Sequence, residues 1–278
     1  MSNLKKTHFI INYKGNKRQE ISTILPTINF NKKKNIVEPF CGSSAMSFAI
    51  WKQYGNKFNY YLNDIDESLI RVHNLMKTET IQDIEDKVNE VRCYVLSQED
   101  IKKTHKSIYE NNRSIYDFIY VNKYCMYGVP HLCLIDTDKW KNRKRLQKVF
   151  KLTPLQREFV EFINQPNVFI SNNDFKTIYE EHKNNPKSII LLDPPYVNTS
   201  KDFYQSNDAE IYSYFSNNSI KKNKASTYVI VDDNWIMRIV FRDCKILSIY
   251  DKQYGVMHKN TNHIIFSNNK ILENNSNA

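Results

Sequence analysis

Short apolar runs recur in two parts of the chain, near its beginning and over its last hundred residues. Each run stops at a polar turn, which is typical of strands in an α/β sheet whose helices lie between them. The runs lie at 35–37, 60–62, 167–170, 189–192, 228–231, 245–249 and 262–266. The run at 189–192 is apolar at every position, as expected of a parallel strand that is buried on both faces.

The middle of the chain, from 76 to 166, has a different pattern. It is rich in charged residues, and no alternation of strands and helices is visible in it. Apolar residues at helical spacing predict helices at 84–96 and 115–127. A segment of this character between two α/β segments indicates a mostly helical insertion.

These patterns predict how the chain is divided. Residues 1–75 and 167–267 form one α/β domain with the cofactor and substrate sites, and 76–166 form an inserted helical subdomain. The polar residues 268–278 form a disordered tail.

Charge narrows the choice of partner. The 40 lysines and arginines outnumber the 30 acidic residues, which gives a net charge of +10 and favours a polyanion. Basic residues are dense at 139–145 and stand near Tyr124, Tyr127 and Trp140. This combination suits a nucleic-acid surface, where cations meet phosphates and rings stack, although a solvated charged face has the same composition.

The sequence predicts a soluble, intracellular protein, in the cytoplasm of a bacterium or of a phage- or virus-infected cell. No apolar run approaches the ~20 residues that span a membrane, and the first residues lack a secretory signal. Five unpaired cysteines fit a reducing compartment. Cys125, His131 and Cys133 match no common zinc spacing, so we predict no metal.

Asp193 ends the apolar run at 189–192, and two prolines follow it. Neither proline can donate to a sheet ladder, so the strand must end there in a rigid turn. A carboxylate is thereby fixed at the carboxyl edge of a parallel strand, where ligands of open α/β sheets bind. The ring of Tyr196 follows three residues later. A capping Asp before a proline-rich loop is the simpler interpretation.

A second turn, from 38 to 45, joins a predicted strand to a predicted helix. Small residues and free amide groups at a helix N-terminus suit a nucleotide-like ligand. Gly42 is the single glycine there, so neither a GxGxxG nor a GKS/T phosphate motif is present. Asp64 and Asp66 follow the next run. An acid in that position accepts hydrogen bonds from ribose hydroxyls, or it caps the following helix.

Five motifs now stand in order along the chain: N-Y-K-G-N-K at 12–17, E-P-F-C-G at 38–42, N-D at 63–64, D-F at 174–175 and D-P-P-Y at 193–196. In this order they resemble those of the Dam-like DNA adenine-N6 methyltransferases, the D12 class of alpha type. That class carries its target-recognition region between the cofactor motif and D-P-P-Y. The resemblance covers roughly 9–75 and 165–267.

The resemblance implies a Rossmann-like α/β fold that uses S-adenosyl-L-methionine and acts on double-stranded DNA. The cofactor-binding residues that it implies are Tyr13, Lys17, Phe40, Gly42, Asp64, Asp174, Phe175 and Asp193. In the family, the tyrosine and lysine of the first motif hold the cofactor, the E-P-F-x-G turn binds its methionine part, and the D-F pair sits against its adenine. We expect the protein to be a monomer.

The resemblance also implies the catalytic residues Asp193, Pro194 and Tyr196. The exocyclic amine of adenine is a poor nucleophile because its lone pair is delocalised into the ring. The carboxylate of Asp193 and the carbonyl of Pro194 can accept its two hydrogens and free that lone pair, while Tyr196 stacks on the flipped-out base.

Two departures from the family pattern leave alternatives open. Ser43 and Ser44 stand where the family usually has a further glycine, and the stretch 122–128 lacks the Arg and Asn of relatives that read GATC. The target sequence therefore does not carry over, and neither does membership of a restriction–modification system. The alternatives are an RNA base methyltransferase of the same fold and a catalytically silent DNA-binding relative.

Overall fold

The computed structural model describes residues 7–11, 13, 17–111, 114–124, 147–195, 208–253 and 260–269. The described helices and 3-10 turns are η1 (Lys17–Gln19), α1 (Ile21–Ile24), η2 (Leu25–Thr27), α2 (Ala45–Tyr54), η3 (Gly55–Lys57), α3 (Glu67–Thr78), α4 (Ile81–Leu96), α5 (Ile101–Asn111), α6 (Ile115–Tyr124), α8 (Pro154–Ile163), α9 (Phe175–His182), α10 (Asp208–Asn217), η5 (Ile220–Lys222) and α11 (Trp235–Val240). The strands are β1 (Asn35–Glu38), β2 (Asn59–Asn63), β3 (Val168–Ser171), β4 (Ser188–Leu192), β5 (Ser226–Asp232), β6 (Lys245–Gln253) and β7 (Asn260–Ser267).

The seven strands form one mixed sheet in the order β3-β2-β1-β4-β5-β7-β6. The first five in this order are parallel, and β7 runs antiparallel to both β5 and β6. All seven apolar runs of the sequence therefore fall on strands, and the prediction of an α/β fold is confirmed. Residues 9–11, which are also apolar, form bends and not a strand, and their side chains are buried in the core.

Both faces of the sheet are covered by helices, and this explains why residues 189–192 of β4 are all apolar. Ile189 and Leu191 belong to a buried cluster that includes side chains of α2, α3 and α8. Ile190 and Leu192 belong to a second cluster, with side chains of α9, α10 and α11. Because successive residues of a strand face opposite sides, burial on both faces requires an apolar residue at every position.

The direction in which strands are added reverses between β1 and β4. From β1 the chain adds β2 and β3 on one side, whereas β4 and β5 lie on the other. Asn35 of β1 pairs with Ser188 of β4, and Val37 pairs with Ile190, so the two strands end side by side. Ligands of open α/β sheets bind at the carboxyl ends of the strands at such a reversal. This edge is where the turns after Glu38 and Leu192 meet.

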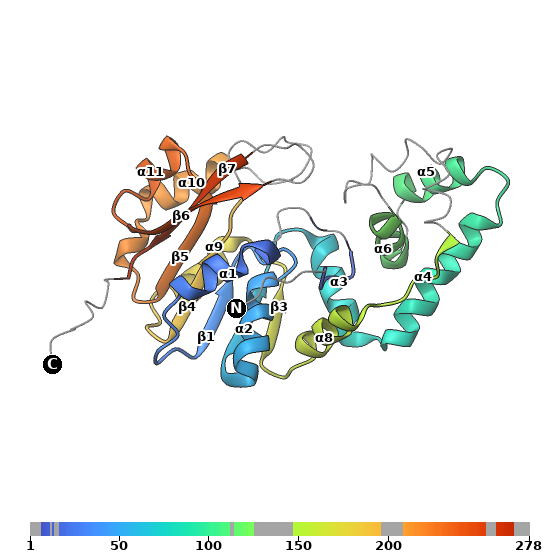
Figure 1. Ribbon diagram of the computed structural model, residues 1–278, viewed down its shortest axis with the longest axis horizontal. Coiled ribbons are helices and arrows are strands. Elements are labelled where there is room, and N and C mark those ends of the chain that lie inside the picture. The colour runs from blue at the N-terminus through green and yellow to red at the C-terminus, as the bar shows by residue number, and fades with distance from the viewer. Residues whose placement is uncertain are drawn as a thin grey trace.

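Helices α4, α5 and α6 lie at one end of an elongated molecule, and the sheet lies at the other (Figure 1). The expected helices at 84–96 and 115–127 correspond to α4 and α6, the latter described as far as Tyr124. Ile84, Val88 and Ile119 belong to the same buried cluster as the sheet residues of β1 and β2. The helical region is thus packed onto the sheet domain through a continuous core.

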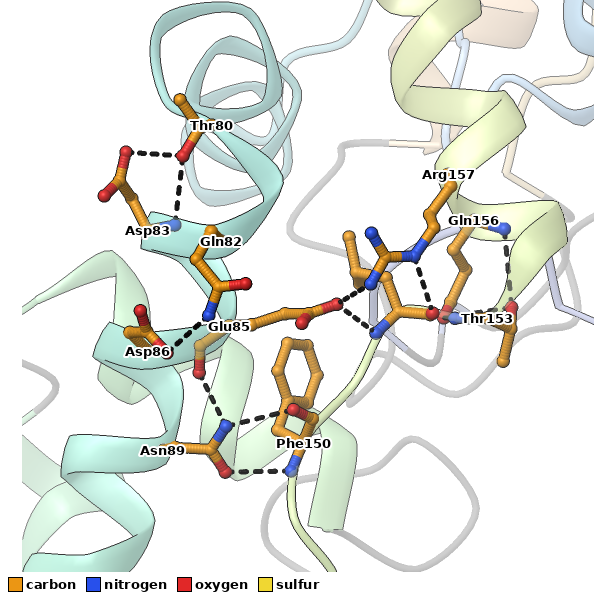
Figure 2. A network of polar contacts seen from close by, with 11 residues as sticks. Thr80, Gln82, Asp83, Glu85, Asp86, Asn89, Phe150, Thr153, Gln156 and Arg157 are labelled. Carbon is orange, nitrogen blue, oxygen red and sulfur yellow. Dashed lines mark hydrogen bonds and ion pairs between the residues drawn. The ribbon is translucent and has the colours of Figure 1, made fainter.

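A polar network fastens the returning chain to α4 (Figure 2). The buried Glu85 accepts hydrogen bonds from the Leu152 amide at 2.8 Å and from Arg157 Nη2 at 2.6 Å. One turn further along α4, Asn89 pairs with both backbone groups of Phe150: its Nδ2 donates to the carbonyl at 3.0 Å, and its Oδ1 accepts from the amide at 2.8 Å. These contacts satisfy backbone groups that no regular element satisfies.

The same side of α4 continues these contacts toward the end of α6. Arg92 Nη1 donates to the carbonyl of Gln147 at 3.1 Å. The hydroxyl of Tyr124, the last residue of α6, donates to the carbonyl of Lys148 at 2.8 Å. The chain therefore leaves α6 and returns at 147–148 at neighbouring places.

Candidate functional site

The turn after β1 is shaped by two residues with left-handed backbone angles. Gly42 has φ +49°, and a Cβ there would lie 2.8 Å from Cε1 of Tyr13. Any side chain at this position would therefore collide with the Tyr13 ring, so the turn requires glycine. Ser44 has φ +53°, a conformation that costs an L-residue roughly 1–2 kcal/mol. Ser44 therefore adopts, at this cost, a backbone conformation that a glycine would adopt without it.

Two buried histidines support this turn. His8 Nε2 donates to the carbonyl of Ser43 at 2.7 Å. His73 Nδ1 donates to the carbonyl of Leu69 at 3.0 Å, which leaves Nε2 to accept from the hydroxyl of Ser44 at 3.2 Å. Burial lowers the pKa of both histidines to about 4, so both rings are neutral near pH 7. Neither histidine stands in a motif, so the sequence contained no signal for this role.

Asp64 links the turn after β1 to the turn after β2. Its Oδ2 accepts the Gly42 amide at 2.9 Å, and its Oδ1 accepts the Asp66 amide at 3.1 Å. Burial raises the pKa of Asp64 to about 6, although both amide hydrogen bonds oppose the shift. Asp66 instead caps α3 by accepting the Leu69 amide at 3.2 Å. Asp66 thus has the capping role that was considered for one of the two acids, and Asp64 faces the turn after β1.

Asn63, the last residue of β2, fixes three loops at once. Its side-chain Nδ2 donates to the carbonyls of Pro39 at 3.1 Å and Asn173 at 2.9 Å. Its Oδ1 accepts from the hydroxyl of Ser171 at 2.8 Å and from the amide of Asn173 at 3.0 Å. The N-D motif therefore contributes a buried amide that holds the ends of β1, β2 and β3 together.

The two residues of the D-F motif have different surroundings. Asp174 is exposed and caps α9 by accepting the Lys176 amide at 2.8 Å. Phe175 is buried and stacks on the ring of Phe40, with centroids 5.0 Å apart and planes at 27°. Phe40 comes from the turn after β1, so this stack joins that turn to the N-terminus of α9.

Asp193 stands at the end of β4, and its carboxylate meets Lys17. The distance from Lys17 Nζ to Asp193 Oδ1 is 2.5 Å, with Lys17 2% and Asp193 16% exposed. Pro194 is buried, and the carbonyl of Pro195 accepts the hydroxyl of Tyr212 at 2.7 Å. The prolines thus hold the carboxylate on a short, anchored turn.

Glu38 adds a third carboxyl group to this edge of the sheet. Its Oε1 accepts the Ser47 amide at 2.9 Å. Burial raises the pKa of Glu38 to about 7, and the charges of Asp193 and Asp64 act in the same direction. Three carboxyl groups therefore influence one another around the point where β1 and β4 end, a setting that favours a positively charged ligand.

A model of the D12 class N6 adenine-specific DNA methyltransferases matches residues 13–263, nearly the whole chain. The chain belongs to this family. It is thus a site-specific DNA adenine methyltransferase, an enzyme of a family whose methyl donor is S-adenosyl-L-methionine. The mixed sheet of seven strands is consistent with that fold. No curated protein matches the sequence. Of the three functions considered from the sequence, the family supports methylation of adenine in DNA.

The adenine methyltransferase brings most of its predicted site residues into contact. Gly42 lies against the ring of Tyr13, and its amide donates a hydrogen bond to Asp64. Phe40 stacks on Phe175, and Lys17 forms an ion pair with Asp193. Other predictions lie outside the described residues: Tyr196, the basic cluster at 139–145, the stretch beyond Tyr124 that departs from relatives, and the Cys125, His131 and Cys133 group.

In the described part of the chain, no three His, Cys, Asp or Glu side chains are arranged to hold a metal ion. No helix among the described residues is long and apolar enough to cross a membrane.

Proposed function

We propose that this methyltransferase acts on an adenine flipped out of double-stranded DNA, with Asp193 as the residue that activates its amine. The observation that carries the proposal is the position of Asp193. Its carboxylate stands at the end of a fully buried strand, at the reversal of the sheet, on a turn stiffened by two prolines. A base stacked in a duplex cannot reach such an edge, so it must leave the helix.

The proposed reaction requires two hydrogen-bond acceptors next to the amine of adenine. The carboxylate of Asp193 and the carbonyl of Pro194 accept the two hydrogens of adenine N6, which shifts its lone pair out of the ring and toward the methyl carbon. The N6–methyl bond forms as the sulfur–methyl bond breaks, and the amine loses one proton toward Asp193. Lys17 keeps the carboxylate in place through its contact with Oδ1. Tyr196 supplies a face for the base.

The turns around Gly42 offer a site for S-adenosyl-L-methionine. When bound, this group supplies a methyl on a positively charged sulfur. The nearby carboxyl groups of Glu38, Asp64 and Asp193 favour that charge, and Gly42 allows close approach to the backbone. Asp64 is placed to accept ribose hydroxyls. Tyr13, Lys17, Phe40, Asp174 and Phe175 complete the proposed set, with Phe175 acting through its stack on Phe40.

DNA recognition is assigned to the inserted region. Residues 76–166 carry the basic cluster at 139–145. Helices α4, α5 and α6 of this range stand at the far end of the molecule from β5, whereas α8 lies beside α2 and α3 (Figure 1). A monomer then contacts the duplex with this region and methylates the flipped base at the sheet edge.

Replacement of Asp193 tests this assignment. Asp193→Asn keeps the shape of the side chain and removes its charge, and Asp193→Ala removes both. We expect each to lower kcat for N6-methyladenine formation by roughly 10³-fold or more, while binding of the methyl donor stays measurable by calorimetry. Methylated DNA is digested to nucleosides, and N6-methyl-2′-deoxyadenosine is quantified by mass spectrometry.

Glu158→Gln is the matched control. Glu158 also pairs with a lysine, Lys52, but it lies on the exposed surface of α8. Its kcat should equal that of the unmodified enzyme. Near-normal turnover by Asp193→Ala would show that Asp193 does not take part in methyl transfer.

A further inference from the structure

Five ionisable side chains that the proposed chemistry does not use gather beside the Lys17–Asp193 pair. They are Glu20, Asp232, Tyr250, Lys252 and His263, and we refer to them as the Glu20 cluster. Glu20 is 4%, Lys252 8% and His263 0% exposed. Charged groups lose much of their solvation free energy when buried, and an apolar packing of similar shape is often more stable. The fold therefore retains these groups at a cost in stability.

Glu20 is the centre of the cluster. Its Oε1 contacts Lys252 Nζ. Its Oε2 accepts the hydroxyl of Tyr250 at 2.7 Å and lies 2.7 Å from His263 Nδ1. These three partners all stand on the β6–β7 hairpin, where Tyr250 pairs with His263 across the strands. One carboxylate thus fastens the segment after η1 to the last two strands of the sheet.

Glu20 and Lys17 stand at the two ends of one turn. The Glu20 amide donates to the Lys17 carbonyl at 2.8 Å, so the two residues move together. The positive charge of Lys17 also acts on the ionisable groups of the cluster. Burial, and then this charge, lower the pKa of Lys252, while the contact with Glu20 favours its charged form. The position of Lys17 is therefore coupled to the cluster both through the backbone and through electrostatics.

We propose that Glu20 is a positioning residue for methyl transfer: it anchors the turn that carries Lys17 to the β6–β7 hairpin and so holds Lys17 against the carboxylate of Asp193. Lys17 Nζ lies 2.5 Å from Asp193 Oδ1. A small displacement of the turn would release that oxygen and rotate the carboxylate. Residues that orient a reacting group in this way strongly influence rates without touching the substrate.

The cluster also gives the proposal a distinctive dependence on pH. His263 Nδ1 faces Glu20 Oε2 at 2.7 Å, and its Nε2 faces Asp232 Oδ1 at 3.0 Å. A neutral imidazole carries one N–H, so a second proton is needed to bond both carboxyl groups. Burial lowers the pKa of His263, and the neighbouring cations Lys17 and Lys252 act in the same direction, while Asp232 opposes the shift. That proton therefore leaves below the usual range of an imidazole, and one ring nitrogen and one carboxylate then repel each other.

Glu20→Gln tests the proposal, because it keeps the shape of the side chain and removes the charge. We expect kcat to fall by about tenfold, with DNA affinity within about twofold of the unmodified enzyme. Because burial lowers the pKa of His263, the step that its second proton contributes to the kcat–pH profile lies on the acid side. This step should move to lower pH in the variant, since a neutral amide stabilises that proton less than a carboxylate does. A side chain with a purely structural role would leave that step in place.

Glu79→Gln is the matched control. Glu79 accepts hydrogen bonds from a lysine and a tyrosine as Glu20 does, from Lys87 at 3.0 Å and Tyr116 at 2.5 Å, but it lies beside α4 and α6. This variant should keep both kcat and the pH profile. Tyr250→Phe, which removes one hydrogen bond to Glu20 and leaves all charges, should lower kcat less than Glu20→Gln does.

The proposal rests on the role assigned to Asp193, and the variants separate the two. Full activity of Asp193→Asn would overturn that role whatever Glu20 does. If Asp193→Asn is inactive but both Glu20→Gln and Tyr250→Phe keep kcat and the pH profile, Glu20 does not position Lys17 and the present proposal fails. If Glu20→Gln does not fold, an unchanged kcat and profile in Tyr250→Phe overturn it equally.

Discussion

Three carboxyl groups at the carboxyl edge of the sheet differ because their partners differ. Asp193 faces a lysine, whereas Glu38 and Asp64 are held mainly by backbone amides. Burial raises the pKa of Glu38 to about 7 and that of Asp64 to about 6. Glu38 and Asp64 therefore change their charge within a range of pH in which an enzyme can be assayed.

Asp64 should make binding of S-adenosyl-L-methionine depend on pH. The carboxyl group is ionised above about pH 6 and protonated below it, and the ionised form is the better acceptor for ribose hydroxyls. Affinity should therefore fall as the pH drops through 6, by up to about tenfold for each further pH unit. Calorimetric titrations at several pH values measure this.

Asp64→Asn provides the comparison for that experiment. The variant should bind the methyl donor more weakly at neutral pH and lose the step near pH 6. A step of equal size in both proteins would assign the titration to another group, such as Glu38.

Sequence motifs predicted well which residues approach one another but not how each is oriented. The contact of Gly42 with Tyr13 follows from two motifs whose spacing suits one ligand. In contrast, the exposed position of Asp174 and the left-handed angle of Ser44 depend on the loops around them. The support from His73 joins residues 29 positions apart, which a local pattern does not reveal.

Among the elements, the strands were the most predictable part. A strand buried on both faces needs an apolar residue at every position, and β4 shows that pattern directly. The reversal between β1 and β4 and the hairpin of β6 and β7 depend on long-range pairing. Helices α4 and α6 of the insertion were visible as periodic patterns, whereas α5 and α8 were not predicted. The side-chain contacts of Glu85 and Asn89 with the backbone of the returning chain were not visible either.

Asn89→Ala should destabilise the protein through the backbone that it leaves unpaired. Both backbone groups of the buried Phe150 bond to Asn89. Loss of a partner for buried polar groups costs about 1–3 kcal/mol, and urea unfolding measures the change. The α5 residue Asn111 bonds within its own exposed helix, to Ser107, so Asn111→Ala should change the free energy of unfolding by less than about 0.5 kcal/mol.

If the two asparagine variants are equally stable, Asn89 does not fasten the returning chain. The neighbouring Glu85 would then have to hold it alone, through the Leu152 amide and Arg157.

At the scale of the whole molecule, charge and shape act together. The net charge of +10 attracts any polyanion, and the elongated form separates the helical region from the far side of the sheet (Figure 1). Charge therefore attracts DNA to the protein, whereas the proposed position of the base at the sheet edge depends on short-range contacts.

Neutralising the basic residues of 139–145 should weaken DNA binding and flatten its dependence on salt. The residues are Lys139, Lys141, Arg143, Lys144 and Arg145. Each phosphate contact that is lost should reduce the slope of log K against log salt by about 0.9. Fluorescence anisotropy with labelled duplex at several salt concentrations measures this slope.

A control that removes three positive charges, against five in the test variant, uses lysines at the other end of the molecule. Lys221, Lys222 and Lys224 are exposed near η5, and their replacement by glutamine should leave the slope close to that of the unmodified protein. Equal slopes in both variants would mean that 139–145 do not touch the phosphates.

The contact between Tyr124 and Lys148 has a consequence for how such enzymes diversify. Because the chain departs from α6 and rejoins α4 at adjoining points, the sequence between them can be exchanged or lengthened with little entropic cost to the helices that border it. Those helices share a core with the sheet. With DNA recognition assigned to this region as proposed, related enzymes can acquire new DNA targets by exchange of one segment, while the residues proposed for methyl transfer are inherited unchanged.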